Sequence, residues 1–168
     1  CFLFVLPLDA DAGKWSNAAS TNVTREYPGL AVMPDGRVLA VTGHPLQGKS
    51  LASAELYDVQ RDEWTATGSL HVPRNGVQPG GLITLPNGKV LITGGGSGSR
   101  SVHETELYDY GMGQWTQTGS MALPRCVHTV TQLTSGNVLV TGGRKRITEE
   151  KHAEVDGCGI VSRKRARD

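Results

Sequence analysis

The sequence has few of the residues that would point directly to chemistry or to a membrane. Aromatic residues make up 5% of its 168 residues, and its three cysteines (Cys1, Cys126 and Cys158) show no CxxC spacing. This argues against a cysteine metal or redox motif and against a disulfide framework. We expect packed or free thiols, with a single Cys126–Cys158 bridge as the alternative. No apolar run reaches the roughly 20 residues of a membrane-spanning helix, so no membrane span is expected.

A broad excess of positive charge is also lacking. Residues 1–143 carry 9 Lys and Arg against 11 Asp and Glu, whereas residues 144–168 carry 8 against 5. Non-specific binding of nucleic acid needs a broad basic surface, so we expect no nucleic-acid partner. The terminal cluster RKRARD (163–168) is interpreted as a solvated tail, with a nuclear-import signal as the alternative.

What the chain does have is glycine and repetition. Its 22 glycines are typical of many short strands joined by tight turns. WTATGSLHVPR (64–74) returns as WTQTGSMALPR (115–125), and AELYD (54–58) returns as TELYD (105–109). Tryptophan is followed ten residues later by arginine at Trp15/Arg25, Trp64/Arg74 and Trp115/Arg125. A period of about 50 residues predicts stacked units or propeller blades.

Each unit contains four short strands. GLITL (81–85), KVLITGG (89–95), ETELYDY (104–110) and QWTQTGS (114–120) are separated by turn residues. Asn87-Gly88 is a preferred pair for a tight hairpin. The same turn recurs in the other units at Asp35-Gly36 and Ser135-Gly136. Gly and Pro interrupt every window of helical length, so the predicted fold class is all-β.

The recurring residues resemble the kelch repeat: Gly-Gly after an apolar strand, Tyr in ELYD, and Trp six residues after the Asp. The resemblance covers residues 14–143 and implies a β-propeller with four-stranded antiparallel blades, innermost strand first. It implies two full blades (28–67 and 81–118), half of a third, and an outer strand at 14–19, about 2.5–3 repeats in all. Structural roles are implied at Gly43, Gly94, Gly95, Gly142, Gly143, Tyr57, Tyr108, Trp64, Trp115 and Arg125.

So few blades form an incomplete propeller, because rings usually close with 4–8. We expect the remaining blades in the same longer chain, or self-association. Residues 1–13 are interpreted as a truncated signal peptide or leader, which favours a secreted protein, or as a leftover strand of an earlier blade. Residues 144–168 are interpreted as a degenerate remainder of the third blade, with HAEVDG (152–157) as its third strand, and a basic tail.

Two motifs suggest chemistry. GHPLQGKS (43–50) matches the phosphate-binding pattern G-x-x-x-x-G-K-[ST]. That chemistry needs a helix after the motif, but LASAELYD (51–58) corresponds to a strand in the next unit, so we predict a blade loop. REYPGLAVMPDGRV (25–38) resembles the tyrosine-bearing strand of the galactose oxidase and glyoxal oxidase group, which implies Tyr27 as a copper ligand.

The rest of the sequence offers that copper little support. The five histidines show no paired ligand spacing, and His128 is interpreted as an ordinary strand residue. We therefore expect no metal, no cofactor and no catalytic residues, and favour a protein that is not an enzyme. A copper radical oxidase is the alternative, and a truncated gene product without a function of its own is the third hypothesis.

The longest loops are expected on one face of the blades. They are GHPLQGKS (43–50), GSGSRSV (96–102) and HVPRNGVQP (71–79). Function tends to reside on loops held by a rigid scaffold, although loops of this kind can also be merely solvated. The candidates for partner contact are Lys49, Arg74, Arg100 and His103. The leading hypothesis is a non-catalytic scaffold that binds a protein or glycan partner.

Overall fold

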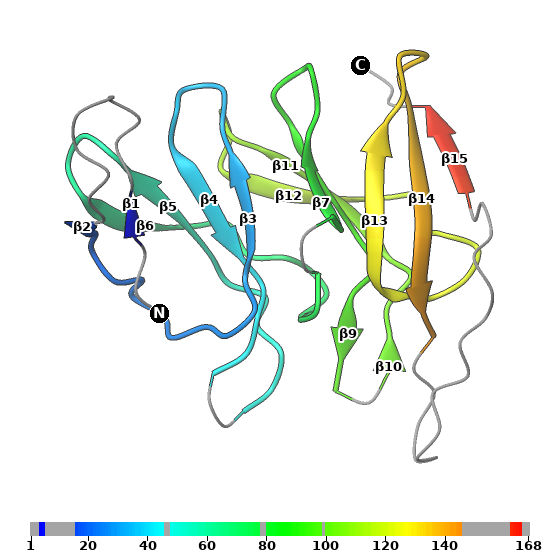
Figure 1. Ribbon diagram of the computed structural model, residues 1–168, viewed down its shortest axis with the longest axis horizontal. Coiled ribbons are helices and arrows are strands. Elements are labelled where there is room, and N and C mark those ends of the chain that lie inside the picture. The colour runs from blue at the N-terminus through cyan, green and yellow to red at the C-terminus, as the bar shows by residue number, and fades with distance from the viewer. Residues whose placement is uncertain are drawn as a thin grey trace.

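The computed structural model describes residues 4–5, 16–45, 48–77, 80–98, 100–145 and 162–165. Every regular element among them is a β-strand, which confirms the predicted all-β class. The strands form three antiparallel sheets that stand side by side, together with two short strand pairs (Figure 1). No helix long and apolar enough to cross a membrane occurs in the described part of the chain.

The first two sheets are complete four-stranded blades. Blade I has the order β3-β4-β5-β6 and blade II the order β7-β8-β11-β12, so each strand pairs with its neighbours along the blade. The bounds of blade I are β3 (Gly29–Val32), β4 (Val38–Val41), β5 (Ala54–Asp58) and β6 (Glu63–Thr67). Those of blade II are β7 (Leu82–Thr84), β8 (Val90–Thr93), β11 (Thr105–Asp109) and β12 (Gln114–Thr118). Both blades lie within the predicted limits.

Blade III has three strands among the described residues. They are β13 (Cys126–Gln132), β14 (Asn137–Arg144) and β15 (Ser162–Arg165). β15 takes the position of a third strand, because Val138 pairs with Lys164 as Val90 pairs with Tyr108 in blade II. The segment 152–157, predicted to be this strand, lies outside the described residues. Cys158, the predicted alternative partner of Cys126, lies outside them as well, and Cys126 is a buried free thiol.

The two short pairs lie at the N-terminus and between β8 and β11. β1 (Phe4–Val5) pairs with β2 (Ser16–Asn17), and β9 (Gly96–Ser97) pairs with β10 (Arg100–Ser101). β2 lies within the outer strand predicted at 14–19. Of the predicted leader 1–13, only Phe4–Val5 is among the described residues.

The core lies between neighbouring blades rather than inside any one of them. Leu39 and Val41 of β4 and Val90 and Ile92 of β8 are all completely buried between blades I and II. Trp115 joins this cluster, as expected of a large ring that fills the gap between two sheets. A second cluster that includes Leu91 and Val140 lies between blades II and III. Each blade therefore depends on its neighbour for burial.

The connections lie on two opposite faces of the blades (Figure 1). We call the lower side in Figure 1 the loop face: it carries segments 42–45, 48–53, 94–98 and 100–104 and the segments that lead into each blade. The upper side, the turn face, carries tight turns in which the N–H of Gly36, Gly88 and Gly136 bonds to the carbonyl three residues earlier. The corresponding turns at Asp35-Gly36, Asn87-Gly88 and Ser135-Gly136 therefore share the same hydrogen bond.

Candidate functional site

Arg74 fixes the base of the loop that joins β8 to β11. Its Nη1 donates to the carbonyl oxygens of Gly94 (2.9 Å) and Glu104 (2.8 Å), which lie at the two ends of that loop. Its Nη2 lies 2.6 Å from Oε1 of Glu106, and both side chains are completely buried. Burial lowers the pKa of Arg74, and the Glu106 carboxylate acts in the opposite direction. Arginine stays protonated in proteins, so the two side chains form a buried salt bridge.

Arg25 fixes the corresponding loop of blade I. Nη1 donates to the carbonyl oxygens of Thr42 (3.1 Å) and Ser53 (2.9 Å), and Nη2 lies 2.6 Å from Oε1 of Glu55. Burial alone would raise the pKa of Glu55, but hydrogen bonds from Arg25 and from backbone N–H groups hold it below its ordinary value. In blade III, Arg125 donates to the carbonyl of Gly142. The loop face therefore rests on a repeated, rigid support.

The glycine at the second position of Thr42-Gly43, Gly94-Gly95 and Gly142-Gly143 permits a close backbone approach. A Cβ on Gly43 would lie 2.5 Å from the carbonyl oxygen of Glu26, and one on Gly143 would lie 2.7 Å from that of Cys126. Gly95 is in the same position, 2.9 Å from the carbonyl of Asn75. The end of the second strand thus meets the segment that follows each arginine, and only glycine fits there.

The residue two positions after each arginine has a left-handed backbone. It is Tyr27 (φ 54°), Gly76 (φ 61°) and Val127 (φ 56°) in the three successive units. Glycine adopts this conformation freely, whereas a tyrosine and above all a β-branched valine are strained in it. Tyr27 and Val127 are 56% and 54% exposed, so their strained backbones present two apolar side chains at the surface.

Two adjoining cavities form a groove along the loop face. The larger, about 650 Å³, is lined by residues that include His44, Lys49, Ser50, Asn75, Ser97 and Gly98. The smaller, about 280 Å³, is lined by residues that include Tyr27, Gly76, Cys126, Val127 and Arg144. His44 and Asn75 line both cavities, which places the two side by side. We refer to the two cavities together as the loop-face groove.

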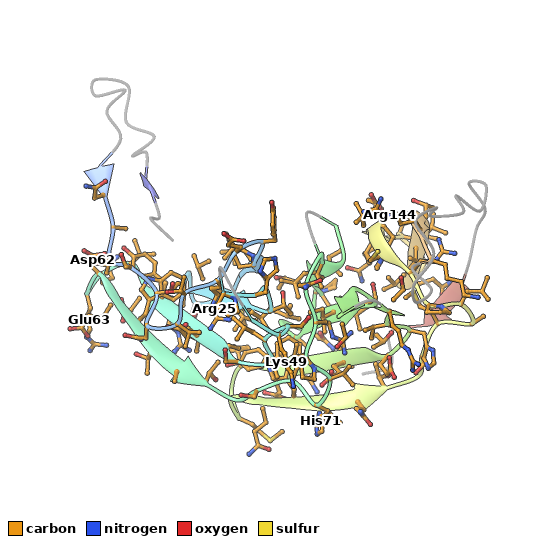
Figure 2. The ribbon with its side chains drawn as sticks, turned by 90° about the horizontal axis from the view of Figure 1, so that it is seen from below. Arg25, Lys49, Asp62, Glu63, His71 and Arg144 are labelled. Atoms are coloured by element: carbon orange, nitrogen blue, oxygen red, sulfur yellow. The ribbon has the colours of Figure 1, made fainter. Side chains whose placement is uncertain are left out.

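The lining of the groove is positively charged. It includes Lys49 and Arg144, and none of its described lining residues is acidic. The carboxylate of Glu26 lies beside this lining, with its Oε2 3.6 Å from Nδ1 of His44. Figure 2 places Lys49 near the middle of the molecule and Arg144 toward one end, with Asp62 and Glu63 at the opposite end. An anionic ligand would therefore meet cations in the groove.

The four residues predicted to contact a partner fall in different environments. Lys49 lines the groove, and Arg100 is exposed on β10 of the same face. The side chain of His103 is half exposed, with Nε2 3.9 Å from Oε1 of Glu104. Arg74 is completely buried against Glu106, so it supports the loop face and cannot contact a partner.

The two motifs that suggested chemistry are also on this face. Gly48, Lys49 and Ser50 of the phosphate-binding pattern line the groove, but Leu51 then bridges to Arg74 and β5 follows, so no helix faces them. Tyr27 lies beside His44, with ring centroids 5.7 Å apart. No group of three or more His, Cys, Asp or Glu residues suited to a metal occurs among the described residues.

Several lining residues were not singled out from the sequence, among them His44, Asn75, Val127 and Arg144. The repeat itself contained the signal for two of them. When the units are aligned on Arg25, Arg74 and Arg125, Asn75 is the next residue in its unit and Val127 is aligned with Tyr27 and Gly76. Glycine in one of the three units is compatible with a left-handed backbone at this position, because glycine adopts that conformation readily.

Comparison with known proteins agrees with this geometry. The Kelch motif family matches residues 83–122, which run from β7 to just beyond β12. This chain therefore contains a kelch motif in blade II. Its fold matches the solved structure of YjhT with a TM-score of 0.71, over 85% of this chain and 52% of that one. The sequence identity in that match is 14%, so it concerns the fold alone.

Kelch-repeat relatives are found in distant organisms. An F-box/kelch-repeat protein of Arabidopsis thaliana is 37% identical over 93 residues, which cover 55% of this chain and 23% of the relative. Kelch-like protein 34 of Homo sapiens is 35% identical over 98 residues, 55% of this chain and 15% of the relative. Alpha-scruin of Limulus polyphemus is 21% identical over 165 residues, 94% of this chain and 17% of the relative. The chain thus spans less than a quarter of each of these relatives.

Proposed function

We propose that this kelch-repeat chain is a non-catalytic interaction module that binds a protein partner through its loop face. The observation that carries the proposal is the loop-face groove of about 650 Å³ and about 280 Å³, formed where long loops from neighbouring blades meet. The turn face, by contrast, carries short turns closed by backbone hydrogen bonds. Loops held on a rigid scaffold are a common place for recognition.

The relatives support a protein partner over a small-molecule substrate. The name of the Arabidopsis thaliana relative combines kelch repeats with an F-box, and none of the three relatives above carries the name of an enzyme. A glycan partner is the alternative that the sequence left open, and no observation on the groove favours it. A copper radical oxidase also lacks a supporting observation, because the Tyr27–His44 pair alone does not make a metal site.

The test is a charge reversal on each face. The immobilised chain would be incubated with a lysate of the source organism, and bound proteins would be quantified by mass spectrometry. We define the specific partners as the proteins that the wild-type chain enriches from the lysate. We expect Lys49→Glu/Arg100→Glu to reduce their capture at least tenfold. The matched control, Arg37→Glu/Arg61→Glu, reverses two charges that belong to surface ion pairs on the turn face, and should retain those partners.

Two results would overturn the proposal. One is capture of the same proteins in the same amounts by wild type and both double variants. The other is loss of the specific partners with the turn-face variant and their retention with the loop-face variant. Circular dichroism of each variant would verify that the fold is retained, since exposed ion pairs contribute little stability.

A further inference from the structure

We propose that two copies of this chain assemble head to tail into one closed ring, with blade I of each copy packed against blade III of the other. The contacts form between the open sides of these two blades, by which we mean the sides that no other described blade covers. This inference goes beyond the proposed function and does not depend on it. Three observations carry it: the arc that the blades form, the open side of blade I and the open side of blade III.

The three blades form an arc whose ends do not meet. Figure 2 shows this arc from the loop face, with Asp62 and Glu63 toward one end and Arg144 toward the other. Rings of such blades usually close with 4–8 of them, so three cannot close alone. The match to YjhT covers 85% of this chain but 52% of that one. Two copies of this chain therefore contain about as much of the fold as YjhT does, and together they supply six blades.

The open side of blade I is apolar. Leu30 and Val32 on β3 are 48% and 63% exposed. Their cross-strand partners on β4 are Ala40 and Val38, which lie on the same side of the sheet. Neither β3 nor β4 contains a charged residue. Adjoining exposed apolar side chains are typical of a surface that packs against a partner.

The corresponding side of blade II shows what covers a surface of this kind. Leu82, at the position of Leu30 in the repeat, packs against the core between blades I and II. Thr84, at the position of Val32, donates from Oγ1 to the carbonyl oxygen of Val32 (2.9 Å). The surface that Leu30 and Val32 leave open on blade I is therefore covered, in the next unit, by the preceding blade.

Blade III has the complementary open side. Leu139 on β14 is at the position of Leu39 in blade I and of Leu91 in blade II. Leu39 and Leu91 are 0% and 6% exposed because the next blade covers each of them, whereas Leu139 is half-buried. Thr131 on β13, the cross-strand partner of Leu139, is exposed on the same side. Blade III thus presents the side on which blade I of a second copy can pack, as blade II packs on blade I.

Two copies cover both open sides at once. The contact joins unlike surfaces, and such contacts form a ring when the rotation between copies closes, here after two copies. Charge does not oppose the contact, since Leu30, Val32, Thr131 and Leu139 are all uncharged. Their apolar surface leaves water in both contacts, which stabilises the dimer. A contact of blade I with blade I would instead leave two blade III sides exposed to water.

The experiment measures the mass and the dimer Kd of the chain by sedimentation equilibrium. At micromolar concentration we expect twice the mass of one chain. Leu30→Lys/Val32→Lys places two cations on the open side of blade I, and Thr131→Glu/Leu139→Glu places two carboxylates on that of blade III. Each variant alone should raise the Kd at least a hundredfold, because every contact in the ring pairs one blade I side with one blade III side.

A one-to-one mixture of the two variants tests the head-to-tail arrangement. It should form a heterodimer with a Kd within tenfold of wild type, because one contact is native and the other pairs lysines with glutamates. The matched control, Val59→Lys/Met112→Lys, replaces apolar side chains that are 49% and 67% exposed in the turns after β5 and β11. Its Kd should stay within twofold of wild type.

A monomeric wild-type chain would overturn the proposal, and so would a trimer or an open polymer. If the blade I variant is monomeric while the blade III variant remains a dimer, two blade I sides pair with each other and the head-to-tail ring is wrong. Dissociation of the control variant, or a mixture that stays monomeric although circular dichroism shows both variants folded, would also refute it. Should Thr131→Glu/Leu139→Glu lose its fold, Thr131→Glu alone takes its place, because Thr131 is exposed.

Discussion

The guanidinium of Arg74 and the carboxylate of Glu106 meet at 2.6 Å, completely buried, although 32 residues separate them in the sequence. The same carboxylate accepts hydrogen bonds from the backbone N–H groups of His71 (2.8 Å) and Val72 (3.2 Å). One ion pair thus joins the segment entering blade II to the third strand of that blade. Arg25 and Glu55 repeat the arrangement in blade I.

Replacement of Arg74 by methionine should strongly destabilise the protein. Arg74→Met keeps much of the apolar stem but leaves the Glu106 charge buried without its partner. Breaking one side of a buried pair typically costs about 3–5 kcal/mol, to be measured by urea unfolding. The control is Arg61→Met, whose pair with Asp58 is on the surface with the arginine 75% exposed; its effect should stay within about 0.5 kcal/mol. If both variants lose the same free energy of unfolding, the buried ion pair stabilises the protein no more than the exposed pair does.

Acid should destabilise the protein through His128. Its Nε2 lies 2.7 Å from Oγ1 of Thr93, at the buried contact between blades II and III. Burial, and then the charge of Arg125, lower the pKa of His128 from 6.5 to about 4. Between these two pH values the unfolded chain binds a proton that the folded chain does not. Stability should therefore fall as the pH drops from about 6.5 to about 4, by up to about 3 kcal/mol.

The variant that isolates this effect is His128→Val, because Val77 occupies the corresponding position in the preceding unit and is buried. Free energies of unfolding at pH values from 7.5 to 4.5 should fall in wild type and remain nearly level in the variant. The lowered pKa of Glu55 acts in the same direction, but only as the pH falls below the ordinary value of 4.5. Parallel curves between pH 6.5 and 4.5 would refute the assignment to His128.

The sequence predicted the blades because their signals are local. Apolar strands that end in glycine, and Asx-Gly turns, recur in register, and the tight turns at Gly36, Gly88 and Gly136 share one geometry. Trp115 was expected to fill the gap between two blades, and it is buried there. Such features depend on residues a few positions apart, so repetition alone is enough to align them.

The burial of Arg74 was not predicted, because the environment of its side chain is set by residues far away in the sequence. A charged side chain in a loop is usually exposed. The burial of Arg74 depends on the carboxylate of Glu106, 32 residues away, and on the carbonyls of Gly94 and Glu104. The groove was missed for a similar reason. Its smaller cavity is lined by Tyr27 and Val127, which have left-handed backbones, and neither residue type indicates a positive φ.

Gly43 and Gly142, near the ends of β4 and β14, should lose different amounts of stability when each is replaced by alanine. Gly43 has φ 95°, and a Cβ there would lie 2.5 Å from the carbonyl of Glu26; Gly142 has φ 68° and no described heavy atom within 4 Å. Gly142→Ala should cost about 1 kcal/mol, from backbone strain alone. Gly43→Ala adds a clash with the backbone and should cost more than about 3 kcal/mol. Urea unfolding of both variants checks this, and equal losses would mean that the close approach is relieved at no cost.

Tyr108 should couple blade I to blade II through its hydroxyl group. That oxygen lies 2.7 Å from Oγ1 of Thr67 at the end of β6, beside a backbone hydrogen bond from Gly68 to Gly113. The ring rests on Trp115, with centroids 5.0 Å apart, and that contact would survive in Tyr108→Phe. Loss of the hydroxyl should therefore cost about 1 kcal/mol, whereas Tyr110→Phe on the partly exposed Tyr110 should be nearly neutral.

A double-mutant cycle with Thr67→Val would isolate the contact between the blades. If the hydroxyl groups bond to each other, Tyr108→Phe and Thr67→Val should show a coupling of about 0.5–1.5 kcal/mol in the free energy of unfolding. If the coupling is zero, the two hydroxyl groups do not bond to each other, and Thr67 donates instead to the carbonyl of Gly113, 3.4 Å away. In a repeat protein this distinction matters, because stability is carried largely by the interfaces between neighbouring units.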